Sequence, residues 1–342
     1  MKKSLLICLF LLSGFIALGQ EENDDESPAY QTLYDDPYDI RNFYLQFQPI
    51  YVDISSINMT GGFGIEWAYY HKSLYDLQIA FRTSYGKRFD ITRDAAIRNA
   101  TNKNDFPIHI NLDFGGTFHV RDIMKESSSK ALLYSKSLKG TEWASTIASH
   151  TTINGKVRRV IGTRLGGIFY SSTVNVNTVL SIQGKELFYT EKIPVLDEKL
   201  YSNLQSFIIY AGGSFTWIKN YAVEFNERWE PTGNDLIITP YLDLLLAASV
   251  KLQDVFLPRE IISTDSIDLL NVGFRGGLNV RFNRKLSWGY GVETGIRPGI
   301  KNMGFYLMVR MSFPIYAIKV PKQAKSNSLR LLSKRNFFRR KK

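Results

Sequence analysis

The sequence predicts an all-β protein, an antiparallel up-and-down transmembrane β-barrel of about 12 strands within a range of 10–14. Apolar and polar residues alternate along one segment after another, and the alternation persists for 11 to 14 residues. Strands of soluble sandwiches average about 5–6 residues, whereas strands that cross a membrane need about 9–11. The polar faces also carry charges in mid-strand. Because only helices and closed barrels satisfy the backbone in lipid, a closed barrel is expected.

The composition excludes other classes of protein. Beyond residue 20, the chain of 342 residues has no apolar run of about 18 residues, the minimum for a spanning helix. With 22 Phe, 19 Tyr and 5 Trp, it has too much apolar surface for a disordered chain. The single cysteine, Cys8, excludes a disulfide scaffold and a cysteine-based zinc site.

The first residues predict export. Lys2 and Lys3 precede an apolar run that ends in Ala17-Leu18-Gly19, which is the pattern of a secretory signal peptide over residues 1–19. Residues 20–41 then form an acidic segment, with eight acids and no base between positions 21 and 40. The barrel is expected over residues 42–318, and a basic segment over 319–342. Both charged segments are predicted to be periplasmic.

The basic tail supplies +9 of the net charge of +11, since residues 321–342 hold nine bases and no acid. A tail of this kind binds anionic lipid, an acidic partner or nucleic acid. We predict no nucleic-acid binding for an exported protein; a solvated disordered tail is the alternative. The predicted partner-binding residues are Arg330, Lys334, Arg335, Arg339, Arg340, Lys341 and Lys342.

The alternation predicts twelve strands, at 42–53, 60–71, 75–86, 107–121, 134–149, 157–171, 176–188, 204–218, 235–252, 268–283, 285–297 and 302–317. An even number places both ends of the barrel in the periplasm. Loop 87–106, turn 150–156, loop 189–203 and loop 253–267 are then expected outside. Glycine pairs at 61–62, 115–116, 166–167, 212–213 and 276–277 predict bends, bulges or close packing in the wall.

The parity of each strand assigns side chains to the two faces of the wall. Charged residues on the polar parity are predicted to face the lumen: Asp113, Arg164, Asp243, Arg275, Arg281, Glu293 and Arg310. Aromatic residues near strand ends are predicted to form girdles at the membrane interfaces: Trp67, Tyr69, Tyr85, Trp217, Trp288 and Tyr306.

These features resemble outer-membrane β-barrel proteins of the Bacteroidota type. The resemblance rests on the signal that ends before Gln20, on Gly-Gly-x-aromatic strands such as Gly115–Phe118 and Gly212–Phe215, and on the final strand, Gly304–Phe313. It covers most of residues 42–317 and implies a bacterial outer-membrane location. Such barrels usually end on an aromatic residue of the last strand, whereas a basic tail follows here.

No catalytic, cofactor or metal site is predicted. Ser149–Lys156 faintly resembles the His-x-Ser-Asn-Gly-Arg stretch of outer-membrane phospholipase, but Thr152 stands in place of the serine. Asn154-Gly155 is instead a strong signal for a two-residue hairpin turn. His109 and Asp113 lie about 13 Å apart along one strand, too far for one ion, so hydrogen bonding in the lumen is expected.

Three functional hypotheses follow. The first is an accessory or scaffold subunit of a larger outer-membrane machine for protein assembly, secretion or uptake, which docks partners through its periplasmic tails and outer loops. The second is a channel or transporter for small solutes through the charged lumen. The third, a barrel lipid hydrolase, is remote, and we expect no enzyme. The expected partners are outer-membrane lipid and lipopolysaccharide, together with other outer-membrane or periplasmic proteins.

Overall fold

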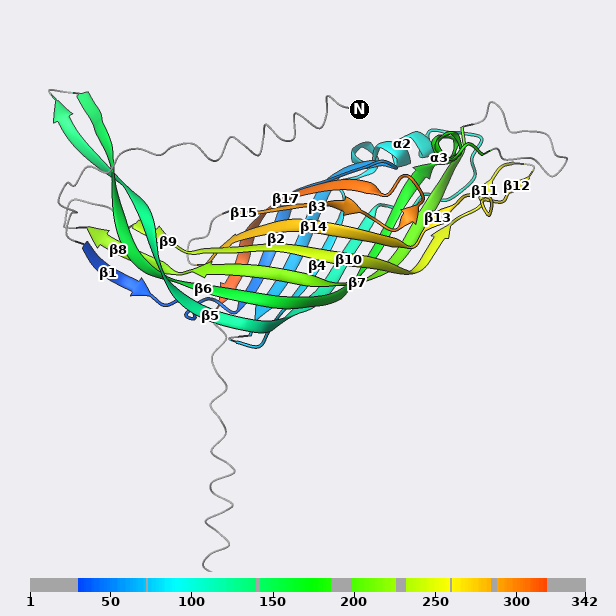
Figure 1. Cartoon of the computed structure of the whole chain (residues 1–342). Coiled ribbons are helices and arrows are strands. Elements are labelled where there is room, and N and C mark those ends of the chain that lie inside the picture. The colour runs from blue at the N-terminus through cyan, green and yellow to red at the C-terminus, as the bar shows by residue number, and fades with distance from the viewer. Residues whose placement is uncertain are drawn as a thin grey trace, which may run out of the picture.

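The computed structural model describes residues 30–71, 73–139, 142–185, 199–225, 232–258, 260–283 and 288–318, with side chains except at residues 131–151, 225 and 232. Ten strands close into one antiparallel barrel in the order β10-β14-β15-β17-β2-β3-β4-β5-β6-β7 (Figure 1). Their bounds are β2 Phe43–Ser55, β3 Met59–Tyr70, β4 Tyr75–Ser84, β5 Ile110–Lys139, β6 Glu142–Asn175, β7 Tyr201–Lys219, β10 Leu236–Leu252, β14 Val272–Phe282, β15 Gly289–Ile296 and β17 Phe305–Ile318. The all-β closed barrel is confirmed, with ten strands rather than twelve.

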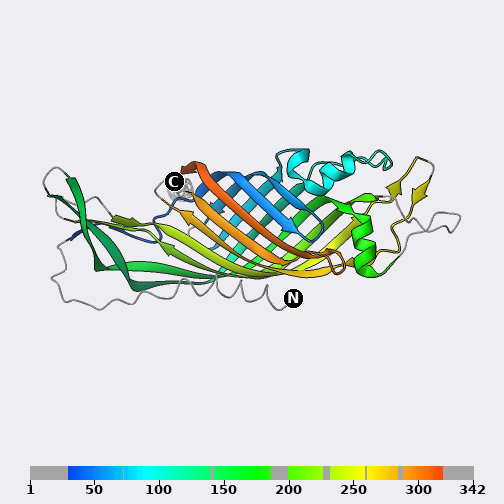
Figure 2. The same cartoon turned by 90° about the horizontal axis from the view of Figure 1, so that it is seen from above.

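The barrel has two different ends, which we name by what lies there. At the hairpin end, β2 begins, β17 ends and the β5/β6 hairpin projects (Figures 1 and 2). A small sheet of β1 Tyr30–Asp35, β8 Tyr221–Phe225 and β9 Thr232–Asn234 lies there too. The helix end carries η1 Lys87–Phe89, α2 Ile91–Ile97, α3 Val176–Gln183, β11 Val255–Phe256, β12 Ile261–Ile262, β13 Leu269–Leu270 and β16 Gly299–Ile300.

The predicted strand at 134–149 is wrong, because β5 and β6 are much longer than the wall of the barrel. β5 runs to Lys139 and β6 starts at Glu142, so these residues pair at the tip of one hairpin. The predicted turn at 150–156 is also wrong: Asn154 pairs with Ser128 inside the hairpin. Alternation and an Asn-Gly signal are local, so neither shows whether a strand stops at the membrane or continues beyond it.

The predicted strand at 176–188 is wrong as well, since residues 176–183 form α3. The buried residues Val176, Val179 and Leu180 follow the i, i+3, i+4 spacing of a helix. The Asn175 side chain accepts a hydrogen bond from the Thr178 amide at 3.3 Å, which caps the first turn. Gly184 ends the helix in the left-handed conformation, at φ 64°.

The loops predicted to share one side do so, apart from turn 150–156. Residues 87–106, 199–203 and the described parts of 253–267 all lie at the helix end. Because the strand number stays even, the wall begins and ends at the hairpin end. Residues 1–29 and 319–342, which include the predicted signal peptide and the basic tail, lie outside the described residues.

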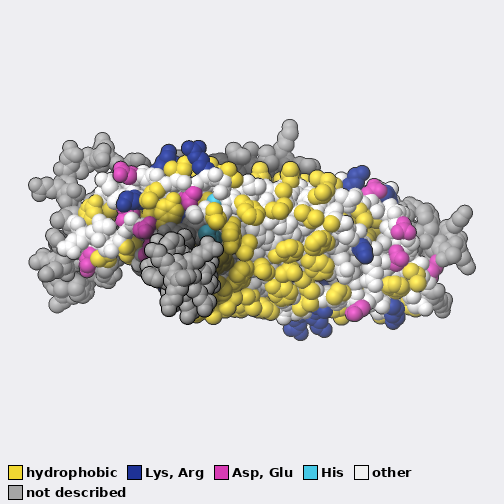
Figure 3. Space-filling model, turned by 90° about the horizontal axis from the view of Figure 1, so that it is seen from below, with side chains coloured by type: hydrophobic (Ala, Val, Ile, Leu, Met, Phe, Trp, Pro, Cys, Tyr) yellow, Lys and Arg dark blue, Asp and Glu magenta, His cyan; other side chains and the backbone are white. Residues whose placement is uncertain are grey.

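The outer surface of the barrel is an apolar belt. In β10, Leu242, Leu244 and Leu246 are exposed, while the alternate side chains of Tyr241, Asp243 and Leu245 are buried inside. Figure 3 shows hydrophobic side chains over the middle of the barrel and charged ones toward its ends. An apolar belt around a polar interior is the arrangement of barrels that cross membranes.

Most of the predicted interfacial aromatics lie on the outer wall, but one does not. Trp288 and Tyr85 are exposed, and Trp67 packs edge-on against Phe43 with 6.0 Å between ring centroids. Tyr306 instead points into the barrel and is 1% exposed, so its assignment to a girdle is wrong. Among the described residues, no helix is long and apolar enough to cross a membrane.

Asp268 ties α3 to the loops at the helix end, and this contact predicts a dependence on pH. Its carboxylate accepts a hydrogen bond from Lys185 Nζ at 2.7 Å, and its amide donates to Gln183 Oε1 at 2.9 Å. The hydrogen bond from Lys185, together with the charges of Lys185 and Lys301, lowers the pKa of Asp268. The contact is therefore present above the ordinary aspartate pKa and is lost as pH falls through the lowered one.

We expect the hydrogen-exchange protection of the Asp268 amide to fall as pH drops below about 4. In Asp268→Asn, which cannot titrate, protection should not change over the same range. An equal loss of protection in both proteins would show that the Asp268 carboxylate does not control this loop.

Candidate functional site in the barrel interior

The interior is filled by side chains in successive layers. At the hairpin end an apolar layer crosses it, made of Ile40, Tyr44, Ala68, Tyr70, Ile218 and Ile237. At the helix end a larger apolar cluster includes Val174, Val179, Leu200, Leu204, Ile208, Leu245, Ile267 and Met303. Between these two clusters lie buried charged and polar residues. A polar interior is thus enclosed by apolar packing on both sides.

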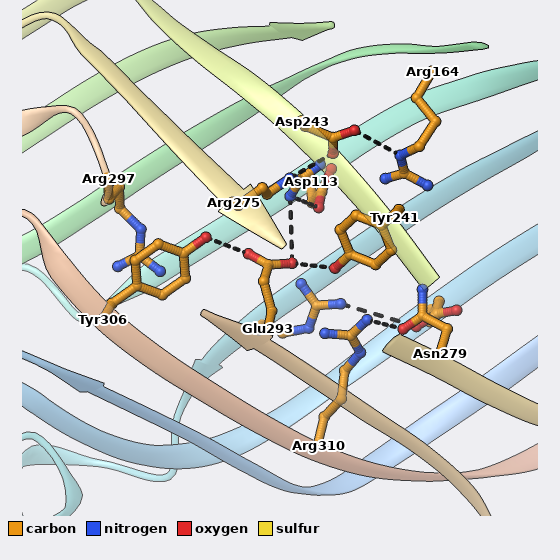
Figure 4. Close-up of polar contacts among 12 residues, drawn as sticks. Asp113, Arg164, Tyr241, Asp243, Arg275, Asn279, Glu293, Arg297, Tyr306 and Arg310 are labelled. Atoms are coloured by element: carbon orange, nitrogen blue, oxygen red, sulfur yellow. Dashed lines mark hydrogen bonds and ion pairs between the residues drawn. The ribbon is translucent and has the colours of Figure 1, made fainter. Parts of the chain in front are cut away.

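Arg275 is the centre of the charged layer (Figure 4). Its Nε donates to Asp243 at 2.8 Å and its Nη1 to Asp113 at 2.7 Å, with Glu293 at 3.5 Å from Nη1. Asp243 also accepts from Arg164 Nε at 2.9 Å. The partners come from β5, β6, β10 and β15, so one cluster connects strands from opposite parts of the wall.

Tyrosines complete the hydrogen bonding around Arg275. The hydroxyls of Tyr241 and Tyr306 donate to the two oxygens of Glu293, at 2.6 and 2.7 Å. The Arg275 guanidinium lies 4.1 Å from the centre of the Tyr210 ring, a distance typical of a cation–π contact. Glu293 is therefore held from three sides, which compensates the desolvation of its charge.

Two further groups occupy the charged layer. Glu66 accepts hydrogen bonds from Arg281 and, at 2.7 Å, from Gln48 Nε2, while Arg82 Nε donates to Gln48 at 2.9 Å. Arg310 donates to Asn279 (Figure 4). One guanidinium nitrogen each of Arg82, Arg275 and Arg310 has no hydrogen-bond partner among the described residues. Buried polar atoms of this kind are where water binds inside proteins.

Toward the helix end, Asp53 holds a separate group. Arg297 Nη2 donates to Asp53 at 3.0 Å, and its guanidinium lies 4.0 Å from the ring centres of both Tyr170 and Tyr306. The Tyr51 hydroxyl is 3.2 Å from Asp53 and 3.1 Å from His109 Nε2. These rings and the Arg297 side chain are all buried inside the barrel.

Glycines in the wall allow side chains to meet across an intervening strand. Arg164 of β6 and Asp243 of β10 both pair with Gly212 of β7, and their side chains meet over it. Tyr241 and Glu293 meet over Gly277 in the same way, and Asn279 and Arg310 meet over Gly291.

A side chain at these glycines would collide with the bonded groups. A Cβ at Gly212 would lie 2.3 Å from an Asp243 oxygen, and one at Gly277 would lie 2.4 Å from the Tyr241 hydroxyl. Paired glycines 115 and 166 both lie under Tyr210. The prediction of close packing at the glycine pairs is confirmed at these positions.

The structure places all seven charged residues of the polar parity inside the barrel. Arg275, Asp113, Asp243, Glu293 and Arg164 form one cluster; Arg281 and Arg310 lie in neighbouring groups. Four further charges lie inside that were not predicted from the sequence: Glu66, Arg82, Arg297 and Asp53. Their inward parity in predicted strands was a usable signal for Glu66 and Arg82.

His109 belongs to the Asp53 group, whereas His119 and the tail residues stand apart from this site. His119 contacts Asp76 at 3.1 Å near the hairpin end. No three described side chains of histidine, cysteine, aspartate or glutamate gather as a metal site would require. Arg330, Lys334, Arg335, Arg339, Arg340, Lys341 and Lys342 lie outside the described residues.

Comparisons with known proteins assign no family. No family model matches the sequence, and no curated protein matches it. Four chains of solved structures match. One is described as "CymD monoaromatic hydrocarbon channel"; the alignment covers 84% of this chain and 93% of that chain, at 8% identity and a TM-score of 0.19. A superposition of that quality carries no argument about function, so the function must be argued from the interior and the ends of the barrel.

Gly212→Ala tests whether the crossing contacts hold the barrel together. The added methyl would displace Asp243 or the Leu242 carbonyl, which lie 2.3 and 2.2 Å from the new Cβ. We expect a loss of about 2–3 kcal/mol in the free energy of unfolding, measured by urea titration with tryptophan fluorescence.

The matched control is Gly213→Ala, the adjacent glycine. There the nearest atom to a new Cβ is the Gly162 carbonyl oxygen at 3.8 Å, so only a small effect is expected. If both variants were destabilised equally, the contact between Arg164 and Asp243 over Gly212 would not explain the effect.

Proposed function

We propose that this protein is a non-conducting barrel of the bacterial outer membrane that anchors a protein partner through its β5/β6 hairpin. The hairpin, a stiff arm that projects beyond the barrel, is the observation that carries the proposal. As a scaffold or accessory subunit, the barrel would hold this arm in the periplasm, where a component of an assembly, secretion or uptake machine would dock.

The arm is long and is unpaired on both sides. β4 stops pairing with β5 at Phe118, and β7 stops pairing with β6 at Val157. Beyond these points β5 and β6 pair, among the described residues, only with each other, as far as Lys139 and Glu142. A free strand edge can accept a strand from another protein. The β5 flank, and the β6 flank from Lys156 toward the tip, are therefore available to a partner.

The base of the arm is fixed by specific contacts. Asp122 of β5 accepts from Arg158 of β6 at 2.7 Å and from the Tyr38 hydroxyl at 3.1 Å. The Arg158 guanidinium also lies 4.4 Å from the centre of the Tyr38 ring. The Lys156 amide donates to Asp35 at 2.9 Å. Residues 35–38 thus brace the hairpin, and a braced arm loses little conformational freedom when a partner binds.

The even strand number and the long loops of the helix end support the orientation. At the helix end, the connections 85–109, 176–200 and 253–271 are long; at the hairpin end, 71–74 and 283–288 are short, whereas 220–235 and the projecting hairpin are long. Short periplasmic turns and long outer loops are typical of bacterial barrels, as is an even strand number. The hairpin end is therefore assigned to the periplasm, and the helix end to the outside.

The packed interior supports a role other than conduction. Arg275, Tyr306 and Arg297 are buried in the middle, and a buried apolar cluster lies toward each end. A path for solutes would need many buried contacts to break at once. An anchoring function needs no such path.

The arm is tested by replacing residues 128–154 with the turn Asn-Gly, which rejoins Ser127 and Gly155. These two residues are partners in the hairpin, so the stem and its contacts at Asp122 stay in place. In mild-detergent extracts sized by mass, the full chain should form a stoichiometric complex, and the shortened chain should be a lone barrel that still shows heat-modifiable migration.

Removal of residues 321–342 is the matched control, because the basic tail is the other candidate docking element. If the complex dissociated when the tail was removed but still formed with the shortened hairpin, the tail and not the arm would be the docking element.

The packed interior also predicts that the barrel does not conduct ions. Purified protein in planar bilayers should give no steady ion current, because buried ion pairs and two apolar layers close the lumen. Steady conductance that changes in Arg275→Gln or Arg310→Gln would overturn this and would favour a channel for small solutes.

A further inference from the structure

An amphipathic segment lies at the rim of the helix end and has no role in the proposed anchoring. This segment, residues 85–98, includes η1 and α2 and is called the rim segment below. It exposes apolar side chains at Tyr85, Phe89 and Ile91. Between them it exposes two consecutive bases, Lys87 and Arg88. Exposed aromatics beside exposed bases are typical of elements at the surface of a membrane.

A row of aromatic rings connects the rim segment to the apolar belt. The ring centroids of Phe313 and Phe47 are 5.8 Å apart, those of Phe47 and Phe63 6.3 Å, those of Phe63 and Tyr85 5.3 Å, and those of Tyr85 and Phe89 5.7 Å. The row crosses the outward faces of β17, β2 and β3. It ends at Phe89, so Arg88 and Lys87 stand where the apolar surface meets the polar end of the barrel.

The rim segment is held rigidly. The buried Asn58 side chain donates to Asp90 at 2.7 Å and accepts from the Thr92 amide at 3.0 Å. Arg93 Nε donates to the Phe106 carbonyl at 2.8 Å. Gly86, at φ 152°, turns the chain directly before the bases. The two bases are therefore presented on a pre-formed support, which lowers the entropy cost of binding.

The charge of the two bases is not compensated within the described part of the protein. Of the acids in the segment, Asp90 is buried against Asn58, and Asp94 pairs with Arg98 at 2.5 Å. Neither the Lys87 nor the Arg88 side chain has an ion-pair partner among the described residues. Free bases at a membrane surface attract phosphate groups of anionic lipids.

We propose that Lys87 and Arg88 bind the phosphate groups of lipopolysaccharide, with Tyr85 and Phe89 against its acyl chains. Two adjacent bases match a lipid that carries two phosphates, and the row of rings offers apolar area for several chains. The assignment rests on the outer-membrane placement and orientation proposed above, since lipopolysaccharide occupies the outer leaflet.

The test uses the full-length protein in detergent and diphosphorylated lipid A, with binding followed by native mass spectrometry. Lys87→Gln with Arg88→Gln should weaken binding by at least about tenfold. The control, Lys125→Gln with Lys130→Gln, removes two exposed charges from the hairpin and should leave binding unchanged. Lys87→Arg with Arg88→Lys keeps the charge and should restore most of the binding, which separates charge from misfolding.

Two outcomes would overturn the assignment. Equal binding by the rim and hairpin variants would show that the rim bases are not the site. If phosphatidylglycerol bound this site as tightly as lipid A, the site would be one for anionic lipid in general. The lipid A measurement needs no protein partner, so its result is independent of the docking experiment. If the full chain formed no complex with a protein partner but still bound lipid A, only the anchoring function would be contradicted.

Discussion

The charges inside the barrel can be buried only if they meet partners from other strands, and the rest of the structure depends on these contacts. Arg275 has carboxylate partners on β5, β10 and β15. An uncompensated buried charge costs several kcal/mol, so the contacts must form together. Many of them pass over a glycine of the strand between, as Arg164 and Asp243 do over Gly212. The contacts between interior side chains thus determine where the wall has glycine.

Because the interior of the barrel is filled by side chains, we place the function on its outer surface and its two ends. The barrel closes with ten strands and encloses its polar centre between two apolar clusters. The accessible surfaces include an apolar belt, a braced hairpin at one end and an amphipathic rim segment at the other. The two proposals use these separately: the hairpin for a protein partner, and Lys87 and Arg88 for lipid. Both elements are rigid because buried contacts, at Asp122 and at Asn58, hold their bases.

Sequence patterns identified the elements whose periodicity is strong and long. Ten of the predicted strands correspond to the ten strands of the barrel, and the inward parity of Arg275, Asp243 and Glu293 followed from alternation alone. The errors arose where the apolar pattern was short or fitted both a strand and a helix. Val176, Val179 and Leu180 fit a helix better than a strand once Asn175 and Gly184 are recognised as its caps. The alternation of apolar and polar residues in β5 does not show where its membrane-spanning part ends.

The sequence by itself determined the fold class, the two faces of the wall and seven of the charged residues that point inward, because a period of two is a local property of the chain. Only the tertiary structure decided which inward residues meet. Asp53 and Arg297 are 244 positions apart and come together because β17 closes the ring on β2. Ring closure and strand stagger set such pairs. They depend on the registers of all the strands together, and no single segment of the sequence contains them.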